Sequence, residues 1–320
     1  MRAASRVMSE AMAAIRECRE AKDLPIDPAT DINITGIIGL KSSPFTTTLG
    51  SLPAKRTSAN PNFAGLMIFL LRKAGVDHGD TIAVGASGSF PALLLAVLSA
   101  ARTMELKPLV FLSLGASQWG ANRPEFHLLH MRACLQEHGT LSFQPVGVSI
   151  GGDQDNGKDM REEGRTLLLK DIRDSGLPVL SDGGLKANVE SRMELYLQKA
   201  AGRPIKAFVN IGGSWANLGT DSSILHLKPG LGKILRFPPE DRQGVVHAMA
   251  ALDIPVIHLL FVNGLVQKYG LSWDPVPLPR PGEEELYRQV AEKQESFLYI
   301  SVIYLVLFGV ILGLGKKSST

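Results

Sequence analysis

Several features that would indicate a familiar class of protein are missing from this 320-residue chain. It has no G-x-x-x-x-G-K-[ST] phosphate-binding sequence, which argues against an ATP-dependent ligase. Its net charge is only +3 and its basic and acidic residues are interleaved, so no polybasic arm and no nucleic-acid partner are predicted. The two cysteines, Cys18 and Cys134, fit neither a metal-site spacing nor a disulfide framework, so we interpret both as ordinary small apolar residues.

Charge is also absent from one long stretch, residues 297–315. As a helix, these 19 residues would cross a hydrocarbon core of about 30 Å. Tyr299 and Tyr304 fit one membrane interface, and Lys316 and Lys317 fit the headgroup region at the other. We therefore predict a transmembrane helix over 297–315 followed by a basic tail over 316–320, with a membrane as partner.

The N-terminal region, residues 1–24, is predicted to form an amphipathic helix because Met8, Met12, Ile15 and Cys18 recur at helical spacing. It lacks the apolar core of a signal peptide, and basic residues flank the predicted span on both sides, so the direction of insertion stays open. We expect residues 25–272 to form one α/β domain. Residues 273–296 are predicted to be a stiff Pro-rich spacer and an acidic juxtamembrane helix.

Short apolar runs alternate with helical patterns between these ends. The runs begin at Thr81, Pro108, Pro145, Leu177, Ile205 and Ile254, and they are apolar on both faces, as buried parallel strands are. Helices are predicted over 60–75, 91–104, 124–138, 159–175, 188–201 and 238–252. The order favours an α/β fold: a doubly wound, mostly parallel sheet with helices on both faces, plus the N-terminal amphipathic helix and the C-terminal transmembrane helix.

Three of the predicted strands end in a Gly-x-Ser sequence: GASGS from Gly85, GASQWGAN from Gly115 and GGSWAN from Gly212. In a doubly wound sheet, ligands bind at the carboxyl ends of the strands, where the strand order reverses. We expect these three segments to line one ligand site. The candidate ligand-binding residues are Gly85, Ser87, Gly88, Ser89, Ser117, Trp119, Asn122, Gly213, Ser214, Trp215 and Asn217.

The first segment allows three interpretations. Free backbone N–H groups near Ser87, Gly88 and Ser89, ahead of a helix that begins at Pro91, would favour an anion. The segment could instead be a structural turn. It also approaches the G-x-S-x-G nucleophile elbow, which makes Ser87 a candidate catalytic nucleophile. A nucleophile needs a nearby base, and none can be assigned among the later histidines, His226, His247 and His258.

Two acidic, Gly-rich loops and one hydroxyl-rich segment add further candidates. Asp153, in the loop 151–158, could serve as a ligand for a hard cation such as Mg²⁺, although such loops usually only make turns. Asp182, in the loop 181–184, could support Ser87. The segment 42–61 carries Lys55 and Arg56, and is either a surface loop or a lid that recognises an anion.

Several blocks carry a resemblance to a known family: ITGIIG, SPFTTTLGSLPAKRTSANPNFA, GASGSFPAL and LSLGASQWGANRPEF, followed by a GGD loop. From about Ile15 to the tail, the chain resembles the poly-gamma-glutamate system proteins. The resemblance implies a membrane component of bacteria that make poly-γ-glutamate, working with the synthase components. Members of the family tend to carry an apolar segment before the N-terminal helix. Here either such a span precedes Met1 or the protein is anchored only by its tail.

The expected function is that of a membrane-anchored accessory component in the synthesis, export or processing of poly-γ-glutamate. It would bind the anionic polymer or its precursor at the strand ends, with the globular domain outside the bacterial cytoplasmic (inner) membrane. One alternative is a serine-type hydrolase or acyl transferase acting on γ-glutamyl bonds through Ser87. Another is a structural subunit of the synthase complex without a ligand. The resemblance carries over no catalytic residue and no cofactor.

Overall fold

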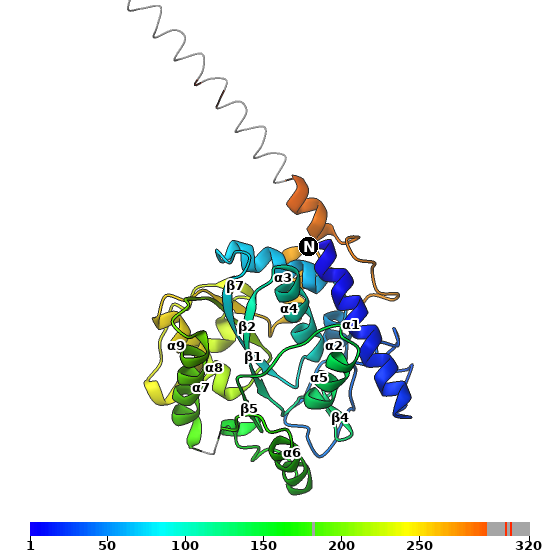
Figure 1. The fold of residues 1–320 in the computed structure, drawn as a ribbon, viewed down its shortest axis with the longest axis vertical. Coiled ribbons are helices and arrows are strands. Elements are labelled where there is room, and N and C mark those ends of the chain that lie inside the picture. Colours follow the sequence, from blue (N-terminus) through cyan, green and yellow to red (C-terminus); the bar gives the residue numbers. More distant parts are fainter. Residues whose placement is uncertain (181–182, 293–304, 306–307, 309–320) are drawn as a thin grey trace, which may run out of the picture.

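The computed structural model describes residues 1–180, 183–292, 305 and 308, and its centre is a six-stranded sheet (Figure 1). In spatial order the strands are β5 (Gly147–Ser149), β2 (Lys107–Ser113), β1 (Thr81–Ser87), β6 (Ile205–Ile211), β8 (Val256–His258) and β7 (Gly230–Gly232). All neighbours pair in parallel except β7, which is antiparallel to β8. The predicted α/β fold with a mostly parallel sheet is therefore confirmed.

Helices cover both faces of this sheet. Both faces need cover because successive side chains of a strand point to opposite faces and β1 carries apolar side chains on both. Ile82 and Val84 belong to one buried apolar cluster, and Ala83 belongs to another. The first cluster includes side chains from α1 (Arg2–Ala21), α3 (Asn62–Lys73), α4 (Pro91–Thr103), α5 (Leu128–Glu137), α6 (Glu162–Asp174) and α10 (Val262–Tyr269). The second includes side chains from α7 (Gly184–Ala200), α8 (Trp215–Leu218) and α9 (Val245–Ala251).

The predicted N-terminal helix is present as α1, and its apolar stripe faces the domain. Met8 and Ile15 are fully buried in the first cluster.

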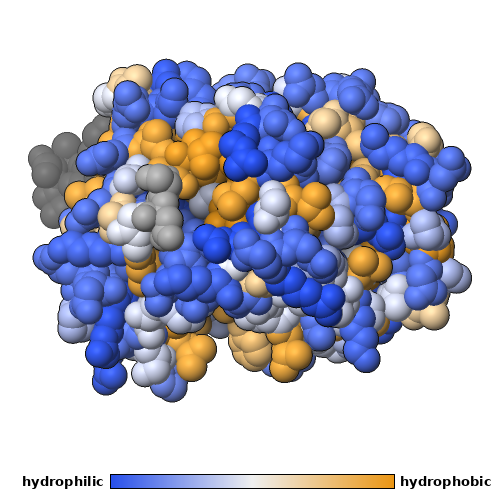
Figure 2. Space-filling view, turned by 90° about the horizontal axis from the view of Figure 1, so that it is seen from below, coloured by the Kyte–Doolittle hydropathy of each residue, from blue (hydrophilic) through white to orange (hydrophobic). Residues whose placement is uncertain are grey.

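Figure 2 shows the molecule from below, where hydrophilic residues separate several groups of apolar ones and no single apolar surface covers this face.

Some predicted elements differ in the structure. The described residues at the start of the run from Leu177, up to residue 180, do not form a strand; there Val179 makes an isolated bridge to Val148 of β5. The helix predicted from Pro124 begins later, because the chain first makes a small hairpin from β3 (Asn122–Arg123) and β4 (Phe126–His127). The segment 42–61 contains a short helix, α2 (Leu52–Ser58), that the sequence analysis did not predict. Short 3-10 helices occupy Asp153–Asp155, Ser222–His226 and Glu240–Arg242.

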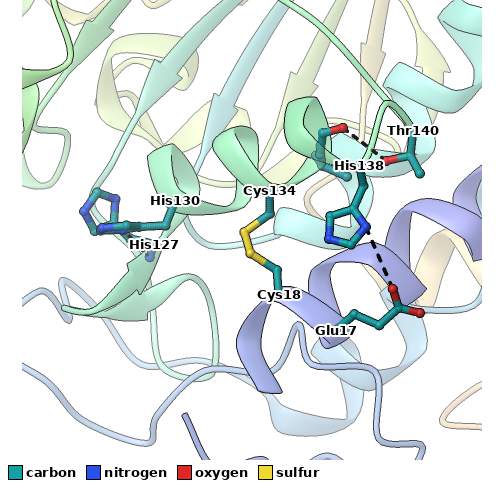
Figure 3. The surroundings of a disulfide bond; sticks show 8 residues. Glu17, Cys18, His127, His130, Cys134, His138 and Thr140 are labelled. Carbon is teal, nitrogen blue, oxygen red and sulfur yellow. Dashed lines mark hydrogen bonds and ion pairs between the residues drawn. A yellow bond between two sulfur atoms is a disulfide. The ribbon is translucent and has the colours of Figure 1, made fainter. Parts of the chain in front are cut away.

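The interpretation of the two cysteines was wrong. Cys18 of α1 and Cys134 of α5 form a disulfide, with their Cα atoms 6.0 Å apart (Figure 3). The two helices pack side by side, and Glu17 and His138 form an ion pair at 3.8 Å across the same contact. Because the cysteines are 116 residues apart in sequence, no local pattern indicated that they meet. The bond fastens the N-terminal helix to the domain.

Residues 273–296 were predicted to be a Pro-rich spacer and an acidic helix. The described part, up to residue 292, is helical over 285–292, and it packs on the domain. Asn33 Nδ2 donates to the Pro275 carbonyl oxygen at 2.9 Å. Leu286 is buried, and the Tyr287 hydroxyl lies 2.6 Å from Ser5 Oγ of α1. The start of α1 and the end of this segment therefore lie side by side, at one end of the molecule (Figure 1).

The predicted transmembrane helix, 297–315, and the basic tail lie outside the described residues, apart from Leu305 and Phe308. Within the part of the chain that is described, no helix combines the length and apolar character needed to cross a bilayer.

Candidate functional site

The carboxyl ends of three strands meet at the point where the strand order reverses. From β1 the chain proceeds to β2 and β5 on one side, and then to β6 and β8 on the other. The register places Ser87 opposite Ser113, and Ala86 opposite Ile211, so the Gly-x-Ser segments that follow leave the sheet at one level. This is the position at which doubly wound sheets bind ligands.

A cavity of about 220 Å³ lies over these strand ends. Seven of the predicted ligand-binding residues line it: Lys55, Ser87, Ser89, Ser117, Gly213, Ser214 and Trp215. The hydroxyl-rich segment forms another part of the wall, through Thr47, Thr48, Leu49, Gly50 and Ser51. The remaining lining residues are Phe90, Gly115, Gly152, Asp159 and Leu260. The structure thus gathers the three Gly-x-Ser segments and the hydroxyl-rich segment around one cavity.

Lys55 enters this cavity because of the local structure of α2. The helix begins after Ser51, whose Oγ accepts the N–H of Ala54 at 3.4 Å, and Pro53 stands in the first turn, where its missing N–H costs nothing. Lys55, on the inner side of this helix, is only 2% exposed. Its Nζ lies 2.8 Å from Ser117 Oγ, and it also donates to the backbone oxygen of Ser89.

The charge state of Lys55 is set by its burial. Taking an ammonium group out of water disfavours the charged form, and this lowers the pKa of Lys55 to about 7. The Phe90 ring, whose centroid is 3.6 Å from Nζ, acts in the opposite direction because the face of an aromatic ring attracts a cation. Near neutral pH, both the ammonium and the amine form of Lys55 are populated.

Arg56, predicted to act together with Lys55, points elsewhere. Its Nε donates to Asp274 Oδ1 at 2.7 Å, and its Nη2 donates to Asp274 Oδ2. The backbone N–H of Asp274 in turn donates to Thr57 Oγ1 at 2.8 Å. Arg56 does not line the cavity; it fastens α2 to the C-terminal segment and so fixes the position of Lys55.

The expected cradle of free N–H groups around Ser87 is not formed by Gly88 and Ser89. The N–H of Gly88 donates to the carbonyl oxygen of Ser113 at 2.9 Å, and that of Ser89 donates to Ser87 Oγ at 3.4 Å. A Cβ atom on Gly88 would lie 2.5 Å from the Leu114 carbonyl oxygen, so the turn itself requires glycine. The expectation was wrong for these two N–H groups because the end of β2 and the loop after it pack on the turn and accept the N–H of Gly88, including through the Gly115 carbonyl oxygen at 3.1 Å, and because Ser87 within the turn accepts the N–H of Ser89.

Among the described residues, no base contacts Ser87. Its Oγ lies 3.5 Å from the Ile211 carbonyl oxygen, and the side chain is 3% exposed. His258 is buried in β8 with Nδ1 3.0 Å from Asn210 Nδ2, and burial lowers its pKa to about 4. His226 and His247 line a different hollow, of about 630 Å³. Asp182, the proposed support for Ser87, lies outside the described residues.

The other predicted ligand-binding residues have structural contacts instead. Asn122 is fully buried, and its side chain bonds to both backbone groups of Leu40 at 2.8 Å. Trp119 is partly buried, and its backbone also pairs with that loop. Gly85 lies against the Asn217 side chain, where an added Cβ would come within 2.6 Å. None of these four residues lines the cavity.

A buried ion pair beneath the strand ends was missed by the sequence analysis. Arg192 of α7 and Asp155 are both fully buried at their side chains and lie 2.7 Å apart. Arg192 Nη2 also donates to Ser113 Oγ at 3.0 Å and to Ser149 Oγ at 2.8 Å, and so ties together the ends of β2 and β5. Nη1 reaches Asn217 Oδ1 at 3.2 Å. The acidic composition of the loop 151–158 indicated that a carboxylate such as Asp155 could have a role there. No sequence pattern near Arg192 indicated that it would pair with Asp155.

The acidic side chain that reaches the cavity from this region is Asp159, the residue directly after the loop, and not Asp153. Asp159 lines the cavity, accepts the N–H of Asp153 at 2.9 Å through Oδ1, and has its pKa raised by burial. Asp153, the candidate cation ligand, has one carboxylate oxygen that is buried without a hydrogen bond in the described structure. Among the described residues, no three His, Cys, Asp or Glu side chains are grouped so that they could hold a metal ion.

Comparisons with known proteins add little. No family model and no curated protein matches the chain. Among solved structures it is matched to LysN, an alpha-aminoadipate aminotransferase from Thermus thermophilus, with 13% identity and a TM-score of 0.16. The match covers 79% of this chain and 47% of the aminotransferase, so the chain spans about half of that protein. A likeness this weak carries no argument about fold or function.

Proposed function

We propose that the cavity binds a carboxylate-bearing chain, and that the protein is a membrane-anchored accessory component of poly-γ-glutamate synthesis, export or processing. The observation that carries the proposal is the placement of Lys55 Nζ, surrounded by serine and threonine hydroxyls, over the strand ends. An ammonium group with neighbouring hydroxyl donors suits a carboxylate, because hydrogen bonds to charged groups are the stronger ones.

The cavity wall also favours a ligand that carries a donor beside its carboxylate. Asp159 lines the cavity with Lys55, and its carboxyl can accept a hydrogen bond. A γ-glutamyl unit offers a free α-carboxylate and an amide N–H within a few bonds of each other. The Lys55 ammonium can bind the carboxylate of such a unit while the Asp159 carboxyl accepts its N–H. Phosphate has no N–H to donate and would be repelled by an ionised Asp159, so it matches the cavity less well.

Two features support a position outside the cytoplasm, beside a membrane. The disulfide between α1 and α5 is of a kind that persists in oxidising compartments and is rare in cytosolic proteins. The start of α1 and the segment leading to the predicted span lie at one end of the molecule (Figure 1). Attachment at that end would leave the rest of the domain in solution.

The binding test uses Thr48, an exposed residue on the cavity wall, so that substitutions there leave the core untouched. Thr48→Glu places a negative charge beside the ligand, whereas Thr48→Gln adds the same bulk without charge. By calorimetry with oligo-γ-glutamate, we expect Thr48→Glu to weaken binding about tenfold at low salt, and less at high salt, because screening reduces the repulsion. Thr48→Gln should stay close to wild type.

An absence of binding in the wild-type protein would favour the structural-subunit alternative. Equal affinities of Thr48→Glu and Thr48→Gln would place the ligand elsewhere. The wild-type affinity should also fall as the pH rises above 7, since Lys55 then loses the proton that a carboxylate needs.

Membrane attachment is tested separately by fractionating cells that express the full chain. We expect the protein in the membrane fraction, and its release when the chain is cut before Phe297, because residues 297–315 contain no charge. The control is a chain that lacks only the basic tail, 316–320, which should stay with membranes. Full-length protein in the soluble fraction without detergent would refute the proposed anchor.

A further inference from the structure

Lys55 and Ser117 are in direct contact inside the cavity. Nζ and Oγ lie 2.8 Å apart, the two residues are 2% and 5% exposed, and both side chains line the cavity. We propose that Ser117 is a nucleophile with Lys55 as its general base, and that the cavity cleaves or transfers the acyl group of a carboxylic amide. Ser87 was the nucleophile predicted from the sequence, but the base lies beside Ser117.

The hydrogen bonds around Lys55 suit the role of a base. A neutral amine keeps two N–H donors and one lone pair. One donor can be used by the backbone oxygen of Ser89, while the lone pair can accept the hydroxyl proton of Ser117. The N–H of Ser117 donates to Ser89 Oγ at 3.1 Å, so the nucleophile is held from a second side. A serine in contact with a positioned base is the arrangement that activates a hydroxyl for attack.

The surroundings of Lys55 decide how much of the amine is present. Burial lowers its pKa to about 7, so a large share of the protein holds a neutral amine near neutral pH. The Phe90 ring, whose centroid is 3.6 Å from Nζ, favours the charged form. Arg56, the next residue on α2, is paired with Asp274 and directed away. Burial outweighs the other contributions.

The chemical steps balance with water or an amine as the second reactant. Ser117 Oγ forms a bond to the amide carbon while its proton passes to Lys55 Nζ. The carbon–nitrogen bond then breaks, and Lys55 returns that proton to the leaving nitrogen. Water, or the amine of another chain, next attacks the acyl carbon with Lys55 accepting its proton. The Oγ–carbon bond breaks, and Ser117 recovers a proton from Lys55.

Ser89 can assist at the carbonyl oxygen. Its Oγ accepts the N–H of Ser117 and lines the cavity, so its own proton can be donated to the oxygen on which negative charge develops. That the acyl group is a γ-glutamyl group rests on the proposed function. The nucleophile itself does not depend on it.

The test therefore uses a probe that carries no glutamate. Full-length protein in detergent is treated with a fluorophosphonate between pH 6 and 9, and the modified peptide is identified by mass spectrometry. We expect one adduct, on Ser117, whose rate of formation rises with pH with a midpoint near 7, as Lys55 becomes neutral. Ser117→Ala should lose the adduct, and Lys55→Met should slow it at least a hundredfold.

Matched controls come from two exposed residues outside the cavity lining: Ser42, the first residue of the hydroxyl-rich segment 42–61, and Lys41 directly before it. Ser42→Ala and Lys41→Met should label at the wild-type rate. If Ser117→Ala fails to fold, the wild-type protein still tests the proposal: the peptide map identifies the labelled serine, and the pH profile shows whether its labelling follows the titration of Lys55. No adduct on the wild type, an adduct on Ser87 or another serine, or normal labelling of a folded Lys55→Met variant would each overturn the proposal. Labelling of Ser117 in a protein that does not bind oligo-γ-glutamate would refute the proposed ligand but support Ser117 as the nucleophile.

Discussion

The burial of Lys55 predicts a particular pH dependence of stability. Its pKa is about 7 in the folded protein and 10.5 in the unfolded chain, so between these values the unfolded state binds more protons. The free energy of unfolding therefore gains a contribution that rises with pH across this window. At about 1.4 kcal/mol per pH unit, the contribution from pH 7 to above pH 10 is on the order of 5 kcal/mol.

Lys55→Met removes this contribution while keeping an unbranched side chain of similar length. At pH 7 the loss of the desolvation cost is partly offset, because the Ser89 carbonyl and the Ser117 hydroxyl lose a partner at about 1–3 kcal/mol each. The difference in the free energy of unfolding between wild type and Lys55→Met isolates the contribution of Lys55, because all other titratable groups are present in both proteins. Relative to the variant, the wild type should gain roughly 3 kcal/mol between pH 7.5 and 9.5.

Thermal unfolding followed by circular dichroism measures this difference. At about 2 °C per kcal/mol for a chain of this size, the midpoint of the wild type should rise by roughly 6 °C relative to Lys55→Met across that interval. Lys41→Met, which removes an exposed lysine directly before the segment 42–61, should give a curve parallel to the wild type. Parallel curves for wild type and Lys55→Met would show that Lys55 keeps its proton, and would refute the assignment of Lys55 as a base.

Two further predictions concern the interactions that hold the site and the N-terminal helix. Asp155→Asn leaves the buried Arg192 without its counter-charge and should lower the free energy of unfolding by about 3–5 kcal/mol, whereas replacing the pair by Leu and Met should cost less. Urea titrations of both proteins check this, and an equal loss in the two would contradict it. Cys18→Ala should lower stability by up to about 5 kcal/mol, because the bond closes a loop of 116 residues. Reducing the wild type should lower its midpoint to that of Cys18→Ala, and a thiol titration should find no free thiol before reduction.

Much of the sheet could be predicted because its strands are encoded locally. TIAVGAS from Thr81 is apolar on both faces and forms β1 over the same residues. The convergence of the strand ends could also be predicted, since parallel strands in register deliver their carboxyl ends to one edge. The run from Leu177 is also apolar at its start, but its described residues, up to 180, form only an isolated bridge, because strand formation depends on a neighbouring strand and not only on the run itself.

The interactions that define the site could not be predicted in the same way. Lys55 and Ser117 are 62 residues apart in sequence, and nothing near either residue indicates the other. Arg192 was hidden for a related reason: an arginine on a helix usually faces solvent, and only the fold shows that this one is enclosed with Asp155. Arg56 looked equivalent to Lys55, yet adjacent residues on a helix do not face the same way, and only one of them enters the cavity.

The packing of residues 273–292 on the domain also determines where the chain can be shortened. A cut after Ser272, the boundary expected from composition, would remove Asp274 along with the predicted span. Arg56 would then lose its carboxylate, and α2 would be released from the segment that holds it in place. A shortened protein of this kind could fail to bind or react although every cavity-lining residue were present. A water-soluble version of the domain should therefore end near residue 292, so that α2 remains fastened from both sides.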